Sequence, residues 1–264
     1  KFSKKICIVK YGGAAMIEES LKNSFARDIT LMKQVGINVA VVHGGGPQID
    51  KELEKSNIKR NFIDGIRVTD KETIEIVSNT LDGIINKEIV DLINKNGGNS
   101  IGVAKDKKGT ISVQKLTTEN IDYGYVGEVV NVNSNYLYEL MNSNYIPVIA
   151  PLGYDSSGQI YNINADTAAS QIASHLSAEK LIFLTDTQGV NDDKGNLIST
   201  LNSKEIKNFI ESDIIRGGML PKINASLEAV SKSVKTAHII DGRIQHSVLL
   251  EIFTNDGIGT LVKK

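Results

Sequence analysis

The chain has 264 residues, the length of one large α/β domain or of two lobes. Hydrophobic residues make up 41% of it and charged residues 23%, a composition that excludes disordered, collagen-like and coiled-coil proteins. The formal net charge of −1 provides no overall attraction to nucleic acid or to an anionic membrane, and the single cysteine, Cys7, excludes an intrachain disulfide and a cysteine-based zinc site.

We expect no targeting signal in the first residues. Lysines at positions 1, 4 and 5 precede an apolar run over 6–9, which is shorter than the roughly 7–15 residues of a signal peptide's apolar region. Nowhere does the chain approach the roughly 18 consecutive apolar residues of a membrane span. We therefore expect a soluble protein of the cytoplasm.

Short runs rich in Ile and Val alternate with longer segments of helical period, the pattern of βαβ units around a mostly parallel sheet. In the first half they predict strands over 6–11, 38–43 and 145–150, and helices over 20–35, 47–55, 71–81 with a resumption to 93, and 134–142. Asp70 is a good N-cap for the third helix. Between 101 and 132 the pattern indicates hairpins or a small lid that includes 107–109.

The second half repeats this pattern after a turn over 155–158. It predicts helices over 166–176, 204–211, 221–235 and 246–253, strands over 181–185, 238–240 and 260–262, and a turn over 192–195. A lobe boundary is expected near 153–157, which divides the chain into residues 1–155 and 156–264.

Four predicted strands run into turns that contain glycine, over 9–13, 42–46, 185–189 and 240–243. In open α/β sheets ligands sit at the carboxyl ends of strands, where glycines let backbone N–H groups approach an anion. Any one of these turns is equally well a tight connection, but three consecutive glycines before a helix favour anion binding. The P-loop, Gly-x-Gly-x-x-Gly and protein-kinase signatures are absent, so neither a P-loop enzyme nor an ordinary dinucleotide enzyme is indicated.

Four charged residues stand in unusual places. Lys10 interrupts a strand that should be buried, so it is either an anion ligand or a lysine whose head reaches solvent. Lys222 falls in the first turn of a helix, where the macrodipole disfavours a cation. Asp166, taken alone, is a helix cap. Arg67 suits a carboxylate clamp or a surface ion pair equally.

The four histidines lack the spacing of metal ligands, so no metal site made of protein residues is expected. His175 and His246 are interpreted as structural.

Several stretches together resemble the acetylglutamate kinases, a branch of the amino acid kinase family, over essentially the whole chain. The matching stretches are VKYGG (9–13), VVHGGGPQID (41–50), GIRVTD (65–70), NINADTAA (162–169), FLTDTQGV (183–190) and GGMLPKINA (217–225). The resemblance implies a three-layer αβα sandwich with a mostly parallel central sheet and two lobes, the first for acetylglutamate binding and dimerisation and the second for ATP. It implies phosphorylation of the side-chain carboxylate of N-acetyl-L-glutamate by ATP with Mg²⁺, in arginine biosynthesis.

The same resemblance assigns roles to individual residues. Lys10 and Lys222 would stabilise the transferring phosphoryl group, and Asp166 would organise the two lysines. The residues implied to contact substrate are Gly45, Gly46, Arg67 and Asn162. The residues implied to contact the nucleotide are Gly12, Gly13, Asp186, Thr187, Gln188, Gly189, Val190, Asn191, Ile214, Ile215 and Arg216.

This chemistry agrees with the residues present, because a carboxylate nucleophile is ionised at pH 7 and needs no general base. Arginine-inhibited members carry an N-terminal helical extension, whereas the first strand here begins by Ile6, so we expect a homodimer that arginine does not inhibit. The alternatives are a sister kinase acting on aspartate, glutamate, carbamate, UMP or aminoadipate, and a non-catalytic sensor of nucleotide or amino acid. Retention of both lysines and Asp166 disfavours the sensor. A dinucleotide oxidoreductase lacks its fingerprint.

Overall fold

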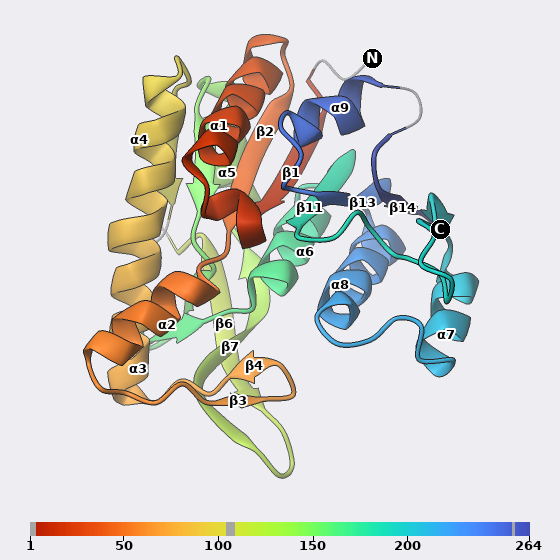
Figure 1. The fold of residues 1–264 in the computed structure, drawn as a ribbon. Helices are drawn as coiled ribbons and strands as arrows, with labels where there is room; N and C mark the ends of the chain where they lie inside the picture. Colours follow the sequence, from red (N-terminus) through yellow and green to blue (C-terminus); the bar gives the residue numbers. More distant parts are fainter. Residues whose placement is uncertain (1–3, 104–108, 255–256) are drawn as a thin grey trace.

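A central sheet of eight strands organises the computed structural model, which describes residues 4–103, 109–254 and 257–264 (Figure 1). In spatial order the strands are β12 (Thr200–Leu201), β14 (Thr260–Val262), β13 (Thr236–Asp241), β11 (Lys180–Thr185), β1 (Ile6–Tyr11), β2 (Asn38–His43), β8 (Ile146–Ile149) and β5 (Ser100–Val103). Neighbours are parallel except β13 and β14. The predicted mostly parallel sheet is therefore confirmed.

Helices cover both faces of this sheet, because alternate strand residues point to opposite sides. Ile8 and Ala40 belong to one apolar cluster, whereas Val9 and Val39 belong to the other. The first cluster includes α5 (Ser134–Asn142), α6 (Ala165–His175), α7 (Ser203–Glu211) and α8 (Met219–Lys232). The second includes α1 (Glu19–Gln34), α2 (Gly46–Lys55), α4 (Lys87–Lys95) and α9 (Ser247–Phe253). This arrangement confirms the three-layer αβα sandwich.

Two small β structures lie beyond the carboxyl ends of β1 and β2 (Figure 1). A closed barrel contains β6 (Ile111–Thr117), β7 (Asp122–Val132), β9 (Leu152–Tyr154) and β10 (Ile160–Asn162), and a hairpin contains β3 (Phe62–Ile63) and β4 (Ile66–Arg67). The hairpin expected between 101 and 132 is confirmed as the antiparallel pair β6 and β7. Residues 107 and 108 of the predicted lid lie outside the described residues.

The helix that Asp70 begins runs further than predicted. Asp70 accepts a hydrogen bond from the Thr73 amide at 2.8 Å, which confirms the predicted cap. The expected interruption after residue 81 is wrong, because α3 (Lys71–Ser78) continues through a π-helical segment, η2 (Asn79–Asn86), into α4. A π segment adds a residue to the turn and changes which side chains face inward. Here it buries Asn86.

The other elements for which the sequence predicted a residue range fall within a few residues of their predicted bounds. Helix α8 begins at Met219 rather than at Pro221, and a 3₁₀ turn, η1 (Gly13–Met16), follows β1. The central sheet contains strands from both sides of the 155–158 turn, and the division into two lobes stays a prediction. Among the described helices, none combines the length and the apolar character that a membrane crossing requires.

Candidate active site

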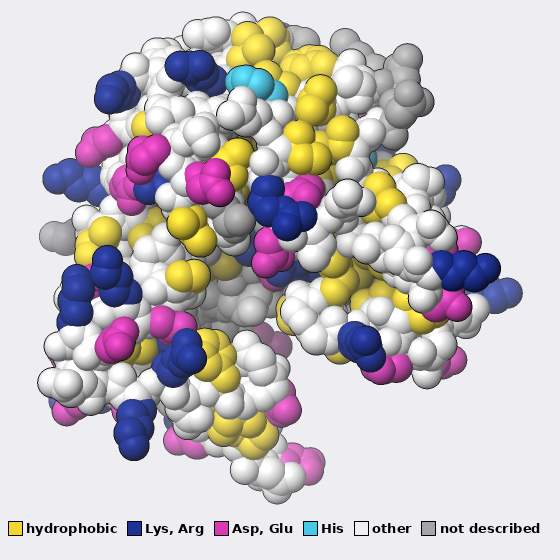
Figure 2. Space-filling model, viewed as in Figure 1, with side chains coloured by type: hydrophobic (Ala, Val, Ile, Leu, Met, Phe, Trp, Pro, Cys, Tyr) yellow, Lys and Arg dark blue, Asp and Glu magenta, His cyan; other side chains and the backbone are white. Residues whose placement is uncertain are grey.

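A cavity of about 360 Å³ opens where β1 and β2 end. It collects eight of the residues singled out in the sequence, which are Lys10, Gly12, Gly13, Gly45, Gly46, Arg67, Asn162 and Asp166. Figure 2 shows that this face of the molecule is hollowed between the side that carries α2 and the side that carries α8. The cavity lies at the carboxyl ends of parallel strands, where ligands bind in open α/β sheets.

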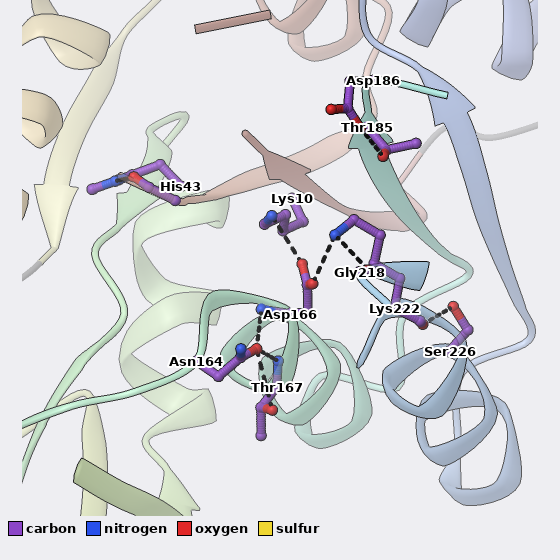
Figure 3. A network of polar contacts seen from close by, with 11 residues as sticks. Lys10, His43, Asn164, Asp166, Thr167, Thr185, Asp186, Gly218, Lys222 and Ser226 are labelled. Atoms are coloured by element: carbon purple, nitrogen blue, oxygen red, sulfur yellow. Dashed lines mark hydrogen bonds and ion pairs between the residues drawn. The ribbon is translucent and has the colours of Figure 1, made fainter. Parts of the chain in front are cut away.

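Two lysines converge on one carboxylate, Asp166, which lines this cavity together with Lys10 (Figure 3). Lys10 extends from β1 and its Nζ lies 2.9 Å from Asp166 Oδ1. Lys222 extends from α8 and its Nζ lies 3.2 Å from Asp166 Oδ2. Lys10 and Asp166 are buried, so the interpretation of Lys10 as a lysine that reaches solvent is wrong. The three side chains carry a net charge of +1.

Asp166 is not the cap of α6. Asn164 is the cap, because its Oδ1 accepts hydrogen bonds from the amides of Asp166 at 2.9 Å and Thr167 at 3.1 Å. The Asp166 carboxylate is thereby free to face the lysines. Burial alone raises the pKa of this carboxyl, but the charges of Lys10 and Lys222 outweigh burial and hold the pKa below its usual value.

Two glycines bring the backbone close to this centre because no side chain fits there. A Cβ on Gly12 would lie 2.9 Å from the Nζ of Lys10. A Cβ on Gly45, the residue before α2, would lie 2.5 Å from Ile85 and 2.9 Å from Leu81 of η2. Both turns therefore present backbone amides, rather than side chains, to the cavity.

Arg67 lines the opposite part of the cavity. Its guanidinium lies 4.5 Å from the centre of the Phe62 ring, and its Nη2 donates to Asp50 Oδ1 at 2.5 Å. Arg67 does form an ion pair, with Asp50, but Arg67 is 7% exposed, so the pair does not lie on the open surface as that alternative supposed. Its buried Nη1 has no hydrogen-bond partner among the described residues, which marks an unused donor toward a ligand. Nothing in the sequence identified Asp50, since its role depends on Arg67 in another element.

Two amide side chains line the same cavity. Asn162 donates to Thr69 Oγ1 at 3.4 Å, a long contact that leaves the amide free to serve a ligand. The buried Oε1 of Gln48 has no partner in the described part of the chain. The cavity therefore offers donors and an acceptor as well as positive charge.

Of the residues expected along the nucleotide, Gly12 and Gly13 line this cavity, whereas those over 186–191 and 214–216 lie outside it. The turn after β11 is nevertheless close to it, because a Cβ on Gly13 would lie 3.8 Å from the Asp186 amide nitrogen. Asp186, Thr187 and Gln188 are exposed in that turn. Val190 and Ile215 are 2% exposed and pack in the apolar core, so only their backbone could meet a ligand.

The other residues of this group have local partners or packing. Gly189 packs against Thr260, and Asn191 forms a bridge with Leu197. Ile214 is half-buried, and Arg216 pairs with Asp213 at 3.2 Å. Their contact with nucleotide stays a prediction.

The histidines differ in their surroundings. His175 Nδ1 lies 2.8 Å from the Gln171 carbonyl on α6, and His246 lies 2.6 Å from Asp28 where α9 begins. The first contact lies within α6 and the second joins α1 to the start of α9, and neither histidine lines the cavity. Within the described ranges, no group of three or more His, Cys, Asp or Glu side chains could hold a metal ion.

Comparison with known proteins adds a family relation. Residues 5–241 match the amino acid kinase family. Acetylglutamate kinase of Campylobacter curvus (strain 525.92) is 52% identical over 263 residues, which cover 100% of this chain and 93% of that protein. N-acetylglutamate synthase from Neisseria gonorrhoeae, complexed with coenzyme A and N-acetyl-glutamate, matches with a TM-score of 0.88 and 22% identity over 100% of this chain and 60% of that one. Carbamate kinase from Giardia lamblia bound to AMP-PNP matches with a TM-score of 0.70 and 16% identity over 100% of both chains.

Proposed function

The chain belongs to the amino acid kinase family, and from that premise we propose that it transfers the γ-phosphoryl group of ATP to the side-chain carboxylate of N-acetyl-L-glutamate, a step of arginine biosynthesis. The expected resemblance to acetylglutamate kinases is confirmed by the 52% identity over the whole chain. The observation that carries the proposal is one cavity lined both by Arg67, whose buried Nη1 has no partner in the described part of the chain, and by Lys10 and Asp166, with Lys222 paired to Asp166 beside it.

The Lys10–Asp166–Lys222 centre suits a reaction between two anions, a carboxylate and the γ-phosphate of ATP. The acceptor carboxylate is already ionised near pH 7, so it attacks phosphorus directly and no base removes a proton. The P–O bond to the leaving ADP breaks as the new bond forms, and negative charge spreads over the transferring oxygens. Lys10 and Lys222 neutralise that charge from two sides, while Asp166 holds both ammonium groups in place.

Arg67 binds the α-carboxylate of the acetylated amino acid in this proposal. Its free Nη1 donates to the ligand, while Asp50 and Phe62 fix the plane of the guanidinium. Asn162 reaches the amide end of the substrate, and the Gly45 and Gly46 amides reach the reacting end. This placement orients the side-chain carboxylate toward Lys10.

ATP lies beside β11 in this proposal, along 186–191 and 214–216, with Gly12 and Gly13 at its phosphates. Mg²⁺ arrives with the nucleotide and, when bound, neutralises phosphate charge. The Asp166 carboxylate already pairs with two ammonium groups, which fits an ion held chiefly by the phosphates. Residues 1–155 serve acetylglutamate binding and dimerisation, and 156–264 serve ATP.

We further propose that the enzyme is a homodimer of the cytoplasm, the compartment that supplies ATP. Ile84 is 50% exposed on η2 and, with Leu92, lines a surface groove whose other lining side chains are mostly charged, so the groove offers a second copy both apolar and charged contacts. Light scattering would give the mass of a dimer, and the mass of a hexamer would contradict the proposal.

The decisive assay traps the acyl phosphate with hydroxylamine as an acyl hydroxamate. N-acetyl-L-glutamate is compared with glutamate, aspartate and aminoadipate in the presence of ATP and Mg²⁺. We expect signal with N-acetyl-L-glutamate alone. Signal with another carboxylate would support a sister kinase, and no signal from protein that binds nucleotide would support a sensor.

A further inference from the structure

His43, the last residue of β2, has no assigned part in the reaction and is 0% exposed beside the active cavity. Its Nδ1 lies 2.9 Å from the carbonyl oxygen of Gly44. Its Nε2 lies 3.1 Å from the side-chain nitrogen of Asn86, which the π-helical segment η2 buries. Figure 3 shows the ring at the edge of the polar network around Lys10.

The two ends of this chain of contacts determine where the imidazole proton lies. Carbonyl oxygens only accept hydrogen bonds, and the Nδ2 of Asn86 donates to the Val148 carbonyl at 2.8 Å. The second hydrogen of the same NH₂ group is directed at His43, so the Nε2 of His43 accepts a hydrogen bond from Asn86. A neutral imidazole has one donor and one acceptor, and therefore Nδ1 carries the hydrogen that the Gly44 carbonyl accepts.

The ring is also held neutral. Burial is the main reason that the pKa of His43 falls to about 4, and the positive charge of Lys10 lowers it further, although the contact with Gly44 acts in the opposite direction. A second hydrogen on Nε2 would face the NH₂ of Asn86. His43 therefore adds no charge beside the Lys10–Asp166–Lys222 centre.

The peptide between Gly44 and Gly45 needs such an external support. Neither residue has a Cβ to restrict its backbone, and Gly45 must remain glycine because a Cβ would collide with Ile85. The Gly44 amide donates to the Tyr11 carbonyl at 2.8 Å, and the Gly45 carbonyl accepts from the Ile49 amide at 2.9 Å. The Gly45 N–H has no partner in the described part of the chain.

In a trans peptide the carbonyl and the following N–H point in opposite directions. Holding the Gly44 carbonyl toward His43 therefore holds the Gly45 N–H away from it, on the side where Gly45 lines the cavity. We propose that His43, oriented by Asn86, is a positioning residue that keeps the Gly45 amide aimed at the anionic oxygens of the reacting groups. This role rests on the proposed function, in which Gly45 contacts the substrate.

The hydrogen-bond part of this proposal is tested without any activity measurement. The full chain is labelled with ¹⁵N-histidine, and His43→Asn identifies the His43 signals among the four histidines. We expect a neutral ring with hydrogen on Nδ1 at pH 7. Hydrogen on Nε2, or an imidazolium at pH 7, would overturn the proposal even if the enzyme were active.

The functional part uses a pair of variants that differ in one donor. His43→Leu removes the donor to Gly44, whereas His43→Asn keeps an NH₂ group near the position of Nδ1. Deleting one amide that stabilises a transition state lowers kcat by about 100- to 1,000-fold. In His43→Leu the Gly45 amide is still present but less well oriented, so the loss should be smaller. We therefore expect His43→Leu to lower kcat about 10- to 100-fold. His43→Asn should recover about tenfold of that loss.

His175→Leu is the matched control, because His175 also contacts a backbone carbonyl through Nδ1 but lies outside the cavity. Its kcat should stay within about twofold of wild type. A wild-type kcat in His43→Leu, or equal losses in His43→Leu and His43→Asn, would overturn the positioning role. If the wild-type chain forms no acyl phosphate from N-acetyl-L-glutamate, the proposed function fails, and the proton position still decides whether the hydrogen-bond chain exists. Thermal unfolding shows which variants are folded.

Discussion

Replacing Lys222 with methionine tests whether its ammonium acts on the transition state. The Nζ lies 3.2 Å from Asp166 Oδ2, and at this distance two unit charges interact by about 5 kcal/mol at an effective dielectric constant of about 20. Of the electrostatic energy of Lys222, only the part that is gained as charge moves onto the transferring oxygens in the transition state affects kcat. Losing one donor of this kind costs about 2.7–4 kcal/mol, so kcat should fall about 100- to 1,000-fold. The KM for N-acetyl-L-glutamate should change little, because Lys222 does not line the cavity in which Arg67 binds the substrate in this proposal.

The hydroxamate assay measures both constants, and Lys232→Met provides the control on the same helix. Lys232 pairs with Glu228 at 2.9 Å on the surface, so its loss should leave kcat unchanged and cost at most about 1 kcal/mol of stability. In Lys222→Met the Asp166 carboxylate keeps Lys10 at 2.9 Å, so the fold should persist. A kcat within threefold of wild type, or a large rise in KM at constant kcat, would refute the catalytic role of Lys222.

Three other predictions concern buried polar groups. Arg67→Ala should raise the KM for N-acetyl-L-glutamate at least about tenfold with a smaller effect on kcat, because it removes the free Nη1 from the cavity; an unchanged KM would remove Arg67 from substrate binding. Asp166→Asn should lower the free energy of unfolding by about 3–5 kcal/mol at pH 7, because the buried ammonium of Lys10 and the half-buried ammonium of Lys222 lose their partner. The pKa of Asp166 is lower in the folded chain than in the unfolded one, so the stability difference between wild type and Asp166→Asn should be complete above the unfolded pKa of about 3.9. It should disappear as the pH falls through the pKa of the folded state. A stability difference that grows in acid would contradict an ionised Asp166 in the folded protein. Burial raises the pKa of Cys7 to about 12, so a thiol reagent should label it only after denaturation, and rapid labelling of native protein would contradict its buried place in β1.

Elements with strong local signals could be predicted from the sequence. The bounds of β1, β2 and α5 agree with their apolar periods, and Asp70 caps its helix as expected. The two-residue strands β3 and β4 gave no such signal, because their pairing depends on Phe62 packing over Arg67. The π segment was equally hidden, since Asn86 is buried by contacts with His43 and Val148 rather than by a local preference.

The candidate site shows the same limit. The position of Lys10 in an apolar strand indicated a buried charge, and the structure supplies the partner. The sequence, read locally, indicated Asp166 as the cap of α6, although Asn caps helices as well as Asp does. Long-range contacts determine which residue caps the helix. The Asp166 carboxylate pairs with Lys10 and Lys222, and the Asn164 side chain accepts the hydrogen bonds of the cap.

The central position of β1 has a consequence for folding during synthesis of the chain. Its residue Cys7 pairs with Lys180 of β11, 173 positions later in synthesis. At roughly 5–20 residues per second, the backbone N–H and C=O groups along one edge of β1 wait about 9–35 s before their partner strand is synthesised. Strand β2 covers the other edge much earlier. An unpaired strand edge recruits other strands, so this interval is when the nascent chain is most exposed to aggregation and most in need of a chaperone.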